Sequence, residues 1–244
     1  MAKAKKKGGA LEFVKTIVYA LLIAGVFRTV LFQPFWIPSG SMKETLLVGD
    51  YLFISKYAYG YSQASCPVVF GTNICPAFSG RLFGSEPERG DVIVFKHPRT
   101  REDYIKRLVG LPGETIQMRE GVLHIDGAPV GMEREGTFTD GFGRRLEVWR
   151  ETLPEGRSHR VLNMADGMTF DDTPPVVVPA GHYFFMGDNR DNSRDSREPR
   201  AAGGVGSVPF EDLVGRAEMI AFSFDGWFFE VWNWRAGRFF KRID

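Results

Sequence analysis

The chain reads Asp91-Val-Ile-Val-Phe95 and, after a short polar break, Tyr104-Ile-Lys-Arg-Leu-Val109. Both runs are rich in β-branched and aromatic residues and are bounded by glycine, proline or charged residues, which is typical of β-strands. Runs of the same kind occur on either side of this pair, at residues 51–56, 115–118, 122–125, 176–178, 182–186 and 214–224. The sequence therefore predicts a fold in which short strands outnumber helices.

A turn signal indicates how neighbouring strands are paired. Asp126-Gly127 directly follows the run at 122–125, and an Asp-Gly pair favours a tight hairpin between antiparallel strands. Residues 61–88 and 131–175 lack comparable runs, so we expect them to be surface excursions from the sheet. The prediction is a mainly β domain built on antiparallel sheets.

The overall composition excludes several classes of protein. Of the 244 residues, 43% are hydrophobic and 14% are aromatic, which is too many aromatic residues for a disordered chain. The mean hydropathy of −0.17 is too low for a polytopic membrane protein. Lysine and arginine total 31 against 30 acidic residues, so no basic face for nucleic acid is indicated. We expect one globular domain with a short appendage and no nucleic-acid partner.

The appendage lies at the N-terminus, where a lysine-rich tail precedes the mostly apolar segment 13–32. As a helix this segment would be about 30 Å long, enough to span a bilayer. Lys15 and Arg28 lie near its ends and could extend their charges to the interface. The lysine-rich tail before the segment favours a cytoplasmic location for the N-terminus. We predict a cytoplasmic tail at 1–12, a transmembrane signal-anchor helix at 13–32 and an extracytoplasmic domain at 33–244.

Two other interpretations of the N-terminal segment stay open. A cleaved secretory signal needs small residues after its apolar run. Here the run ends in Val26-Phe27-Arg28, which is a poor cleavage site. A helix lying on the protein surface is the other alternative, and Arg28 is compatible with it.

Cys66 and Cys75 are the only cysteines. If the domain lies outside the cytoplasm, a disulfide between them is reasonable, because oxidising compartments favour such bonds. Two free, partly buried thiols are the alternative. Neither cysteine has a histidine nearby, and no phosphate-binding loop is present. We therefore expect no metal and no cofactor.

Four segments combine distinctive composition with a fixed order along the chain. They are Pro38-Ser-Gly-Ser-Met-Lys-Glu-Thr-Leu-Leu-Val-Gly-Asp50, Arg89-Gly-Asp-Val-Ile-Val-Phe95, Asp103-Tyr-Ile-Lys-Arg-Leu-Val-Gly-Leu-Pro-Gly113 and Gly187-Asp-Asn-Arg-Asp-Asn-Ser-Arg-Asp-Ser-Arg197. Together they closely resemble the motif boxes of bacterial type I signal peptidase (leader peptidase), and the likeness extends from about residue 32 to 224. The resemblance implies a serine endopeptidase of the bacterial cytoplasmic (inner) membrane that acts beside the phospholipid bilayer. Its substrates would be exported precursor proteins, whose signal peptides it cleaves at Ala-x-Ala sites.

In that family the second serine of Ser-Gly-Ser is the nucleophile and the lysine of Tyr-Ile-Lys-Arg is its general base, which here implies Ser41 and Lys106. A serine hydroxyl needs an adjacent base, yet lysine has an ordinary pKa of about 10.4. To be half neutral near pH 7.5, the pKa of Lys106 must fall by about 3, which corresponds to about 4 kcal/mol. Burial can supply this change if the ammonium pairs with none of the nearby acids, Asp103, Asp188, Asp191 and Asp195.

The resemblance implies roles for four further residues. Ser39 would stabilise the oxyanion through its hydroxyl, together with the backbone N–H of Ser41; such a donor contributes about 3–4 kcal/mol in other serine proteases. Ser193 would hydrogen-bond the lysine and orient it. Asp195 and Arg197 would form an ion pair that holds their loop.

Substrate recognition is expected from the same segments. An extended peptide could lie between residues 35–39 and 103–105 as an added strand. We expect shallow apolar pockets that admit only small side chains, lined by Ile37, Met42, Leu46, Leu52, Val94, Tyr104 and Ile105. One motif departs from the family, which usually has Met-x-Pro-Thr-Leu where this chain has Met42-Lys-Glu-Thr-Leu46. We expect a looser turn there, without loss of a reactive group.

Two other functions are compatible with the motifs. A self-cleaving Ser/Lys repressor-type protease uses the same chemistry, but residues 1–32 offer no room for the DNA-binding module that it needs. A non-catalytic, anchored β-domain would leave Ser41 and Lys106 solvated. The aromatic segment 227–240 fits either docking in the lipid interface or packing on the sheet.

Overall fold

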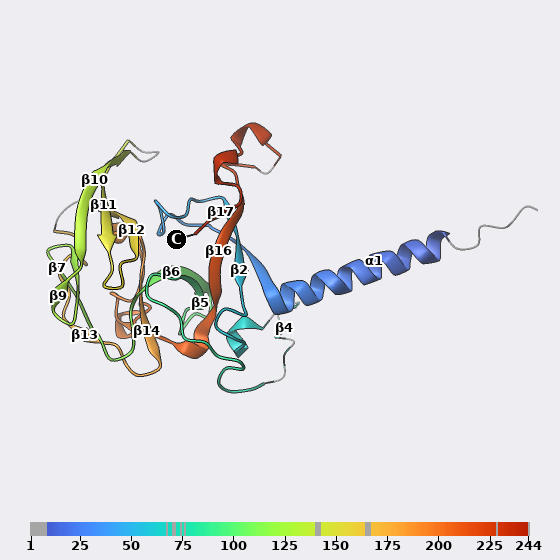
Figure 1. Ribbon diagram of the computed structural model, residues 1–244, viewed down its shortest axis with the longest axis horizontal. Coiled ribbons are helices and arrows are strands. Elements are labelled where there is room, and N and C mark those ends of the chain that lie inside the picture. The colour runs from blue at the N-terminus through green and yellow to red at the C-terminus, as the bar shows by residue number, and fades with distance from the viewer. Residues whose placement is uncertain are drawn as a thin grey trace, which may run out of the picture.

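The computed structural model describes residues 9–66, 68–69, 72–73, 75, 77–139, 143–163, 167–227 and 229–243. Helix α1 (Gly9–Val26) continues as the short π-helix η1 (Phe27–Leu31) and projects from the β body (Figure 1). Most of its apolar side chains are exposed. Over the described part of the chain, no helix is both long enough and apolar enough to cross a membrane. Residues 1–8 of the predicted basic tail lie outside the described residues.

An eight-stranded sheet forms the centre of the body. Its strands follow the order β1-β2-β16-β5-β6-β14-β15, and β17 also pairs with β16. Their bounds are β1 Phe32–Trp36, β2 Asp50–Ser55, β5 Val92–Lys96, β6 Asp103–Gly110, β14 His182–Met186, β15 Val208–Pro209, β16 Leu213–Ser223 and β17 Lys241–Arg242. Every pairing in this sheet is antiparallel, which confirms the predicted mainly β, antiparallel fold.

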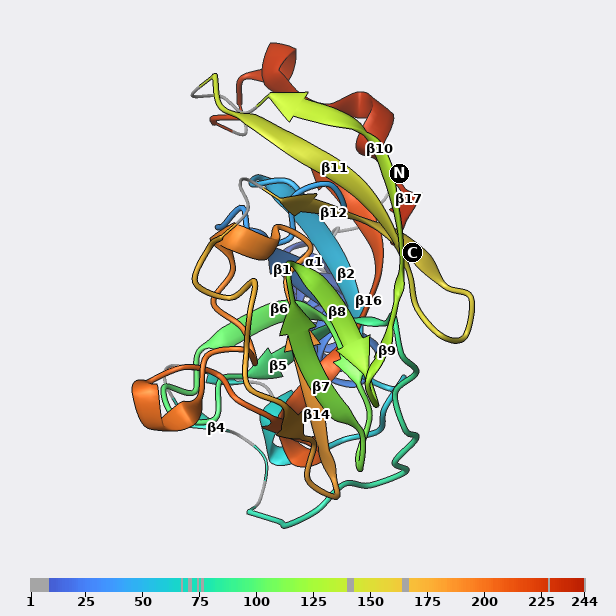
Figure 2. The ribbon, with the colours of Figure 1, turned by 90° about the vertical axis from the view of Figure 1, so that its left-hand side faces the viewer.

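Two smaller sheets lie on the side of the body away from α1 (Figures 1 and 2). One has the order β13-β7-β8-β9 and the other the order β10-β11-β12. Their bounds are β7 Thr115–Arg119, β8 Val122–Ile125, β9 Ala128–Pro129, β10 Gly131–Thr139, β11 Arg145–Thr152, β12 Ser158–Asn163 and β13 Val176–Val177. Between β8 and β9, Asp126 and Gly127 have φ values of 51° and 81°. Two successive residues of positive φ are what a tight hairpin requires, so the predicted hairpin is confirmed.

The sheet β10-β11-β12 lies within residues 131–175, where the sequence predicted only an excursion. Strand β10 is exposed over most of its length and carries charged residues in succession, so it lacks the alternating apolar pattern that marks a strand. The remaining elements are short: β3 Val68–Val69, β4 Thr72–Asn73, η2 Gln63–Ser65, η3 Arg190–Asn192, η4 Arg200–Ala202, η5 Phe210–Asp212, η6 Val231–Asn233 and η7 Ala236–Arg238. A disulfide joins Cys66 to Cys75.

The aromatic C-terminal segment is divided between two environments. Trp227, Phe229 and Trp232 are strongly exposed, so these rings do not pack on the sheet. Trp234 is half-buried and lies against Phe239, with 5.9 Å between ring centroids.

Candidate active site

The segment between β1 and β2 places Ser41 beside the main sheet. Backbone hydrogen bonds hold both of its ends, from Ile37 N to Asp50 O (2.9 Å) and from Gly49 N to Ile37 O (3.1 Å). The next side chain, Met42, is 1% exposed and belongs to the hydrophobic core. A buried anchor directly after the serine therefore fixes where its hydroxyl points.

Lys106 lies on β6, where successive side chains point to opposite faces of the sheet. It is paired with Ile93 of β5 and is only 4% exposed. Lys106 Nζ donates a hydrogen bond to Ser41 Oγ at 2.5 Å. Its neighbour Arg107 forms an ion pair with Asp188. The structure thus brings together the predicted nucleophile and the predicted base.

Burial lowers the pKa of Lys106 from its ordinary value of 10.5 to about 8. The charges of Asp195 and Asp188 oppose this shift without reversing it. The nearby acids are paired with other cations: Asp195 with Arg197 (2.9 Å), Asp188 with Arg107 (2.9 Å) and Asp103 with Lys96 (2.8 Å). Asp191 lies in the lining of the cleft above the site. The lysine is therefore desolvated while three of the four acids are engaged elsewhere.

This lowered pKa predicts a dependence of stability on pH. Because the unfolded chain binds the Lys106 proton more tightly, the buried ammonium costs the folded state about 3 kcal/mol below pH 8. The cost declines between pH 8 and 10.5 and is absent at higher pH. We expect the gain in unfolding free energy from Lys106→Met to be about 3 kcal/mol larger at pH 7 than above pH 10.5. Denaturant unfolding followed by tryptophan fluorescence measures this difference, and equal gains at both pH values would contradict it.

A cleft of about 680 Å³ opens over Ser41 and Lys106. One wall contains Phe35 and residues 38–41, and the facing wall contains residues 103–106. These are the two segments between which an added substrate strand is expected. Ser39 Oγ lies 3.4 Å from Ser41 Oγ, so a second hydroxyl stands beside the first. The rest of the lining comprises Phe170, Asp191, Asn192, Ser193, Arg194 and Glu198.

Three lining residues lie outside the four motifs, and only Phe35 among them belongs to a segment that the sequence assigned to substrate binding. Phe170 follows the sheet β10-β11-β12, and Glu198 lies just past the last motif. Only the fold brings them to the cleft, so no sequence signal could have found them.

Ser193 lies in the cleft but does not make the hydrogen bond expected of it. Within the described residues, its buried hydroxyl has no hydrogen bond to Lys106. It lies against Gly187, where an added β-carbon would collide with both Ser193 Oγ and Ser41 O. Glycine at position 187 therefore allows this loop, with Ser193, to pack closely on Ser41.

Asp195 and Arg197 form the ion pair that the resemblance implied. Arg197 donates from Nε and Nη2 to the two carboxylate oxygens of Asp195, both at 2.9 Å. The same arginine donates to Arg190 O at 2.5 Å, and Asp195 accepts from Gly187 N at 3.0 Å. This buried pair therefore joins both ends of the loop that follows β14.

The predicted pocket is mostly incorrect. Only Tyr104 and Ile105 line the cleft. The other five residues belong to the hydrophobic core and are at most 1% exposed: Ile37, Met42, Leu46, Leu52 and Val94. Ile105 belongs to both the lining and this core cluster, so the cleft borders the core at that residue.

The turn after Ser41, where this chain lacks the family's proline, is closed by backbone hydrogen bonds. Glu44, at the place of the family's proline, has a φ of 82°, which proline cannot adopt. Hydrogen bonds from Leu46 N (2.7 Å) and Thr45 N (3.2 Å) to Met42 O close the turn. A left-handed residue thus occupies the place of the proline, and the looser turn stays a prediction.

A chain of buried charges supports the loop after β14; the sequence had indicated Asp188 and Arg190 as residues that hold this loop, but not Glu151 or His159. Asp188 accepts two hydrogen bonds from Arg107 at 2.9 Å and lies 3.8 Å from His159. His159 lies 3.3 Å from Glu151, which accepts a hydrogen bond from Arg190 at 2.5 Å. All five residues are buried. Strands β11 and β12 are thereby connected to the loop that lines the cleft.

Removing one member of this chain should destabilise the protein strongly. Glu151→Ala leaves the buried Arg190 guanidinium without its partner, and we expect it to lower the free energy of unfolding by about 3–5 kcal/mol. Glu147→Ala removes an exposed pair with Arg134 from the same strand and should cost less than about 1 kcal/mol. Denaturant unfolding compares the two variants, and similar losses would contradict a structural role for the buried chain.

Comparison with known proteins shows to which family the chain belongs. A family model described as "Signal peptidase, peptidase S26" matches residues 10–222. The chain belongs to this family. Signal peptidase I of Rickettsia canadensis is 41% identical over 216 residues, covering 86% of this chain and 78% of that protein. Signal peptidase I of Rickettsia rickettsii is 41% identical over 227 residues, covering 90% and 80%.

A solved structure of a signal peptidase I from Enterococcus faecalis V583 is also similar, with 27% identity and a TM-score of 0.33, covering 54% of this chain and 97% of that one. Membership of the signal peptidase family makes the chain a serine endopeptidase, a hydrolase of peptide bonds. The repressor-type and non-catalytic interpretations are thereby excluded.

Proposed function

We propose that this signal peptidase family member removes N-terminal signal peptides from exported precursors at Ala-x-Ala sites, with Ser41 as nucleophile and Lys106 as general base. The observation that carries the proposal is the 2.5 Å hydrogen bond between Lys106 Nζ and Ser41 Oγ in a buried site. The relatives named signal peptidase I support the choice of substrate.

In the acylation step, neutral Lys106 accepts the proton of Ser41 Oγ as this oxygen attacks the scissile carbonyl carbon. The charge that develops on the carbonyl oxygen is stabilised by the Ser39 hydroxyl and the Ser41 backbone N–H. Collapse of this intermediate breaks the C–N bond, and the leaving amine of the mature protein takes the proton from Lys106.

In the deacylation step, the signal peptide is held as an ester on Ser41. Lys106, neutral again, accepts a proton from a water molecule, whose oxygen attacks the ester carbonyl. The second intermediate expels Ser41 Oγ, which recovers its proton from Lys106. The products are the signal peptide with a free carboxylate and the unchanged enzyme.

The form of the cleft supports a preference for small side chains next to the scissile bond. Its walls are the segments 38–41 and 103–106, and an extended peptide fits between them as an added strand. Ile105 of the facing wall is only 6% exposed and packs into the core, so we expect little depth for a side chain on that wall. We therefore expect alanine to be accepted next to the scissile bond more readily than a branched or aromatic side chain.

Cleavage of a defined precursor tests this function. Full-length protein in detergent should cut a precursor after the second alanine of its Ala-x-Ala site, as shown by the mass of the product. A matched precursor with leucine in place of that alanine should be cut at least about 100-fold more slowly. Equal cleavage of the two precursors, or none of either, would contradict the proposal.

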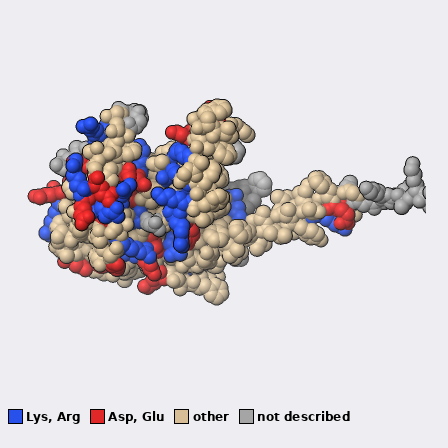
Figure 3. All heavy atoms as spheres, turned by 45° about the horizontal axis from the view of Figure 1, so that its top comes forward, with Lys and Arg blue, Asp and Glu red and all other residues tan. Residues whose placement is uncertain are grey.

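We also propose that α1 and η1, which follow each other without a break over residues 9–31, together carry the chain across the bacterial cytoplasmic membrane, with the basic tail inside and the β domain outside. The support is the exposure of apolar side chains such as Leu21 (67%) and Ile23 (71%) along α1. Figure 3 shows that uncharged residues form nearly all of the surface of this helix. Burial of each large apolar side chain in lipid contributes about 1.5–3 kcal/mol. The membrane-bound protein should resist extraction by alkaline carbonate; release by carbonate alone would contradict attachment.

A further inference from the structure

Two pockets meet where α1 joins the main sheet. The first, of about 380 Å³, has an apolar wall made by Phe27, Phe32, Phe53, Tyr57 and Met219. The second, of about 480 Å³, is lined mainly by polar and charged groups. Both contain Glu218 and Arg242, so the apolar wall of one ends at the charged wall of the other.

Strand register explains why an arginine ends the apolar wall. In antiparallel sheets, directly paired residues carry their side chains on the same face. Phe53 of β2 is paired with Pro34 of β1 and with Met219 of β16, and Met219 is paired with Arg242 of β17. These residues form one row across the sheet. The row lies on the face away from the core, because Leu52, next to Phe53, is fully buried.

Aromatic rings extend this row to the projecting helix. The ring of Phe32 lies 5.6 Å from that of Phe27, 6.3 Å from Phe53 and 5.6 Å from Tyr57, between centroids. Phe27 is the first residue of η1, directly after α1. It is 48% exposed, and Tyr57 is 49% exposed. The apolar groove is therefore continuous with the exposed apolar surface of α1.

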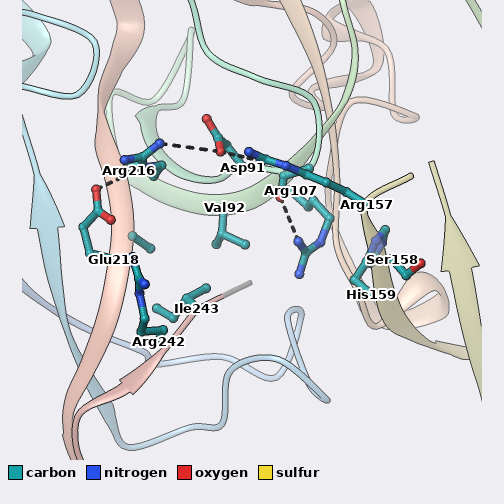
Figure 4. A pocket seen from close by; sticks show the side chains of 12 residues that line it. Asp91, Val92, Arg107, Arg157, Ser158, His159, Arg216, Glu218, Arg242 and Ile243 are labelled. Carbon is teal, nitrogen blue, oxygen red and sulfur yellow. Dashed lines mark hydrogen bonds and ion pairs between the residues drawn. The ribbon is translucent and has the colours of Figure 1, made fainter. Parts of the chain in front are cut away.

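The polar pocket carries more positive than negative charge. Figure 4 shows Arg216, Glu218 and Arg242 along its β16–β17 side, and Arg157 on the opposite side. Arg216 pairs with Glu218 at 2.9 Å, and Arg157 pairs with Asp91 at 2.8 Å. Among the described residues, no carboxylate forms an ion pair with Arg242. One guanidinium at the end of the groove is thus available to bind an anion.

We propose that this junction binds one phospholipid molecule with an anionic headgroup. Its acyl chains lie along the row from Phe27 to Met219, and its headgroup accepts hydrogen bonds from the Arg242 guanidinium. Arginine presents paired N–H donors that match the oxygens of a phosphate. This inference rests on the proposed membrane attachment, because a groove that leads away from a lipid-embedded helix is open to lipid from the bilayer. Charge complementarity selects an anionic lipid over a zwitterionic one.

Native mass spectrometry of the full chain in a neutral detergent tests the site. We expect phosphatidylglycerol to bind at least about tenfold more tightly than phosphatidylcholine with the same acyl chains, because the first carries net charge. Arg242→Gln should remove this preference, and Met219→Glu should weaken binding of both lipids. Arg119→Gln, which neutralises an exposed arginine on β7, is the matched control and should keep the preference.

Two further measurements distinguish a lipid site from a simple anion site and from loss of the peptidase function. Inorganic phosphate should not displace phosphatidylglycerol; displacement would show a simple anion site and overturn the proposal of a lipid. Equal binding of the two lipids to the wild type, or an unchanged preference in Arg242→Gln, would overturn it as well. Arg242→Gln should still cleave a soluble peptide in lipid-free detergent and remain in membranes after carbonate extraction. Failure of the lipid site is therefore distinguishable from failure of the peptidase function or of attachment.

Discussion

Replacing Lys106 with methionine is expected to lower kcat/KM for a precursor by about 10⁴-fold, the full contribution of a general base. Methionine fills a similar volume among the same buried neighbours but cannot accept the proton of Ser41 Oγ. The hydrogen bond of 2.5 Å between these residues is lost, while Asp188 and Asp195 keep their own partners. Cleavage measured with the purified variant tests this expectation.

A second buried lysine supplies the matched control. Lys56 is 1% exposed, burial lowers its pKa to about 8, and it donates a hydrogen bond to Ser65 O at 2.6 Å. It lies outside the lining of the cleft. Lys56→Met should therefore keep a cleavage rate close to that of the wild type. Equal losses in the two variants would mean that burial of a lysine, rather than its contact with Ser41, explains the effect.

Replacing Ser41 with alanine is expected to lower kcat by about 10⁶-fold, as removal of the nucleophile does in other serine proteases. Ser39 Oγ lies 3.4 Å away, but the lysine donates its hydrogen bond to Ser41, so we do not expect Ser39 to act as the nucleophile in its place. Ser39→Ala should cost only about 10²–10³-fold, since it removes one oxyanion donor and leaves the nucleophile in place. Single-turnover cleavage separates these magnitudes. A larger loss in Ser39→Ala than in Ser41→Ala would reverse the assigned roles.

The central strands could be predicted because their residues carry a local signal. The runs at 91–95 and 104–109 correspond to β5 and β6, and each end differs by one residue from the prediction. The Asp126-Gly127 turn was equally clear, because positive φ values at two positions strongly restrict residue choice. In contrast, β10 carries charged residues on an exposed surface, and nothing in its sequence separates it from a loop.

The site was only partly predictable. The pairing of Ser41 with Lys106 came from the resemblance to a family, since no local pattern brings together residues so far apart in sequence. The five apolar residues assigned to the pocket wall belong to the core instead, because hydrophobicity alone does not distinguish a wall from the core. The contact between Glu151 and Arg190 depends on how β11 packs against the loop after β14, which no single segment specifies.

The most direct test of the account is the pH dependence of kcat/KM for a short soluble peptide. If buried Lys106 must be neutral to accept the proton of Ser41, activity should rise tenfold per pH unit on the acid side and level off near a pKa of about 8. An acid limb that continues to rise to pH 10, as for a solvated lysine, would contradict the account. So would activity that does not change between pH 6 and 9.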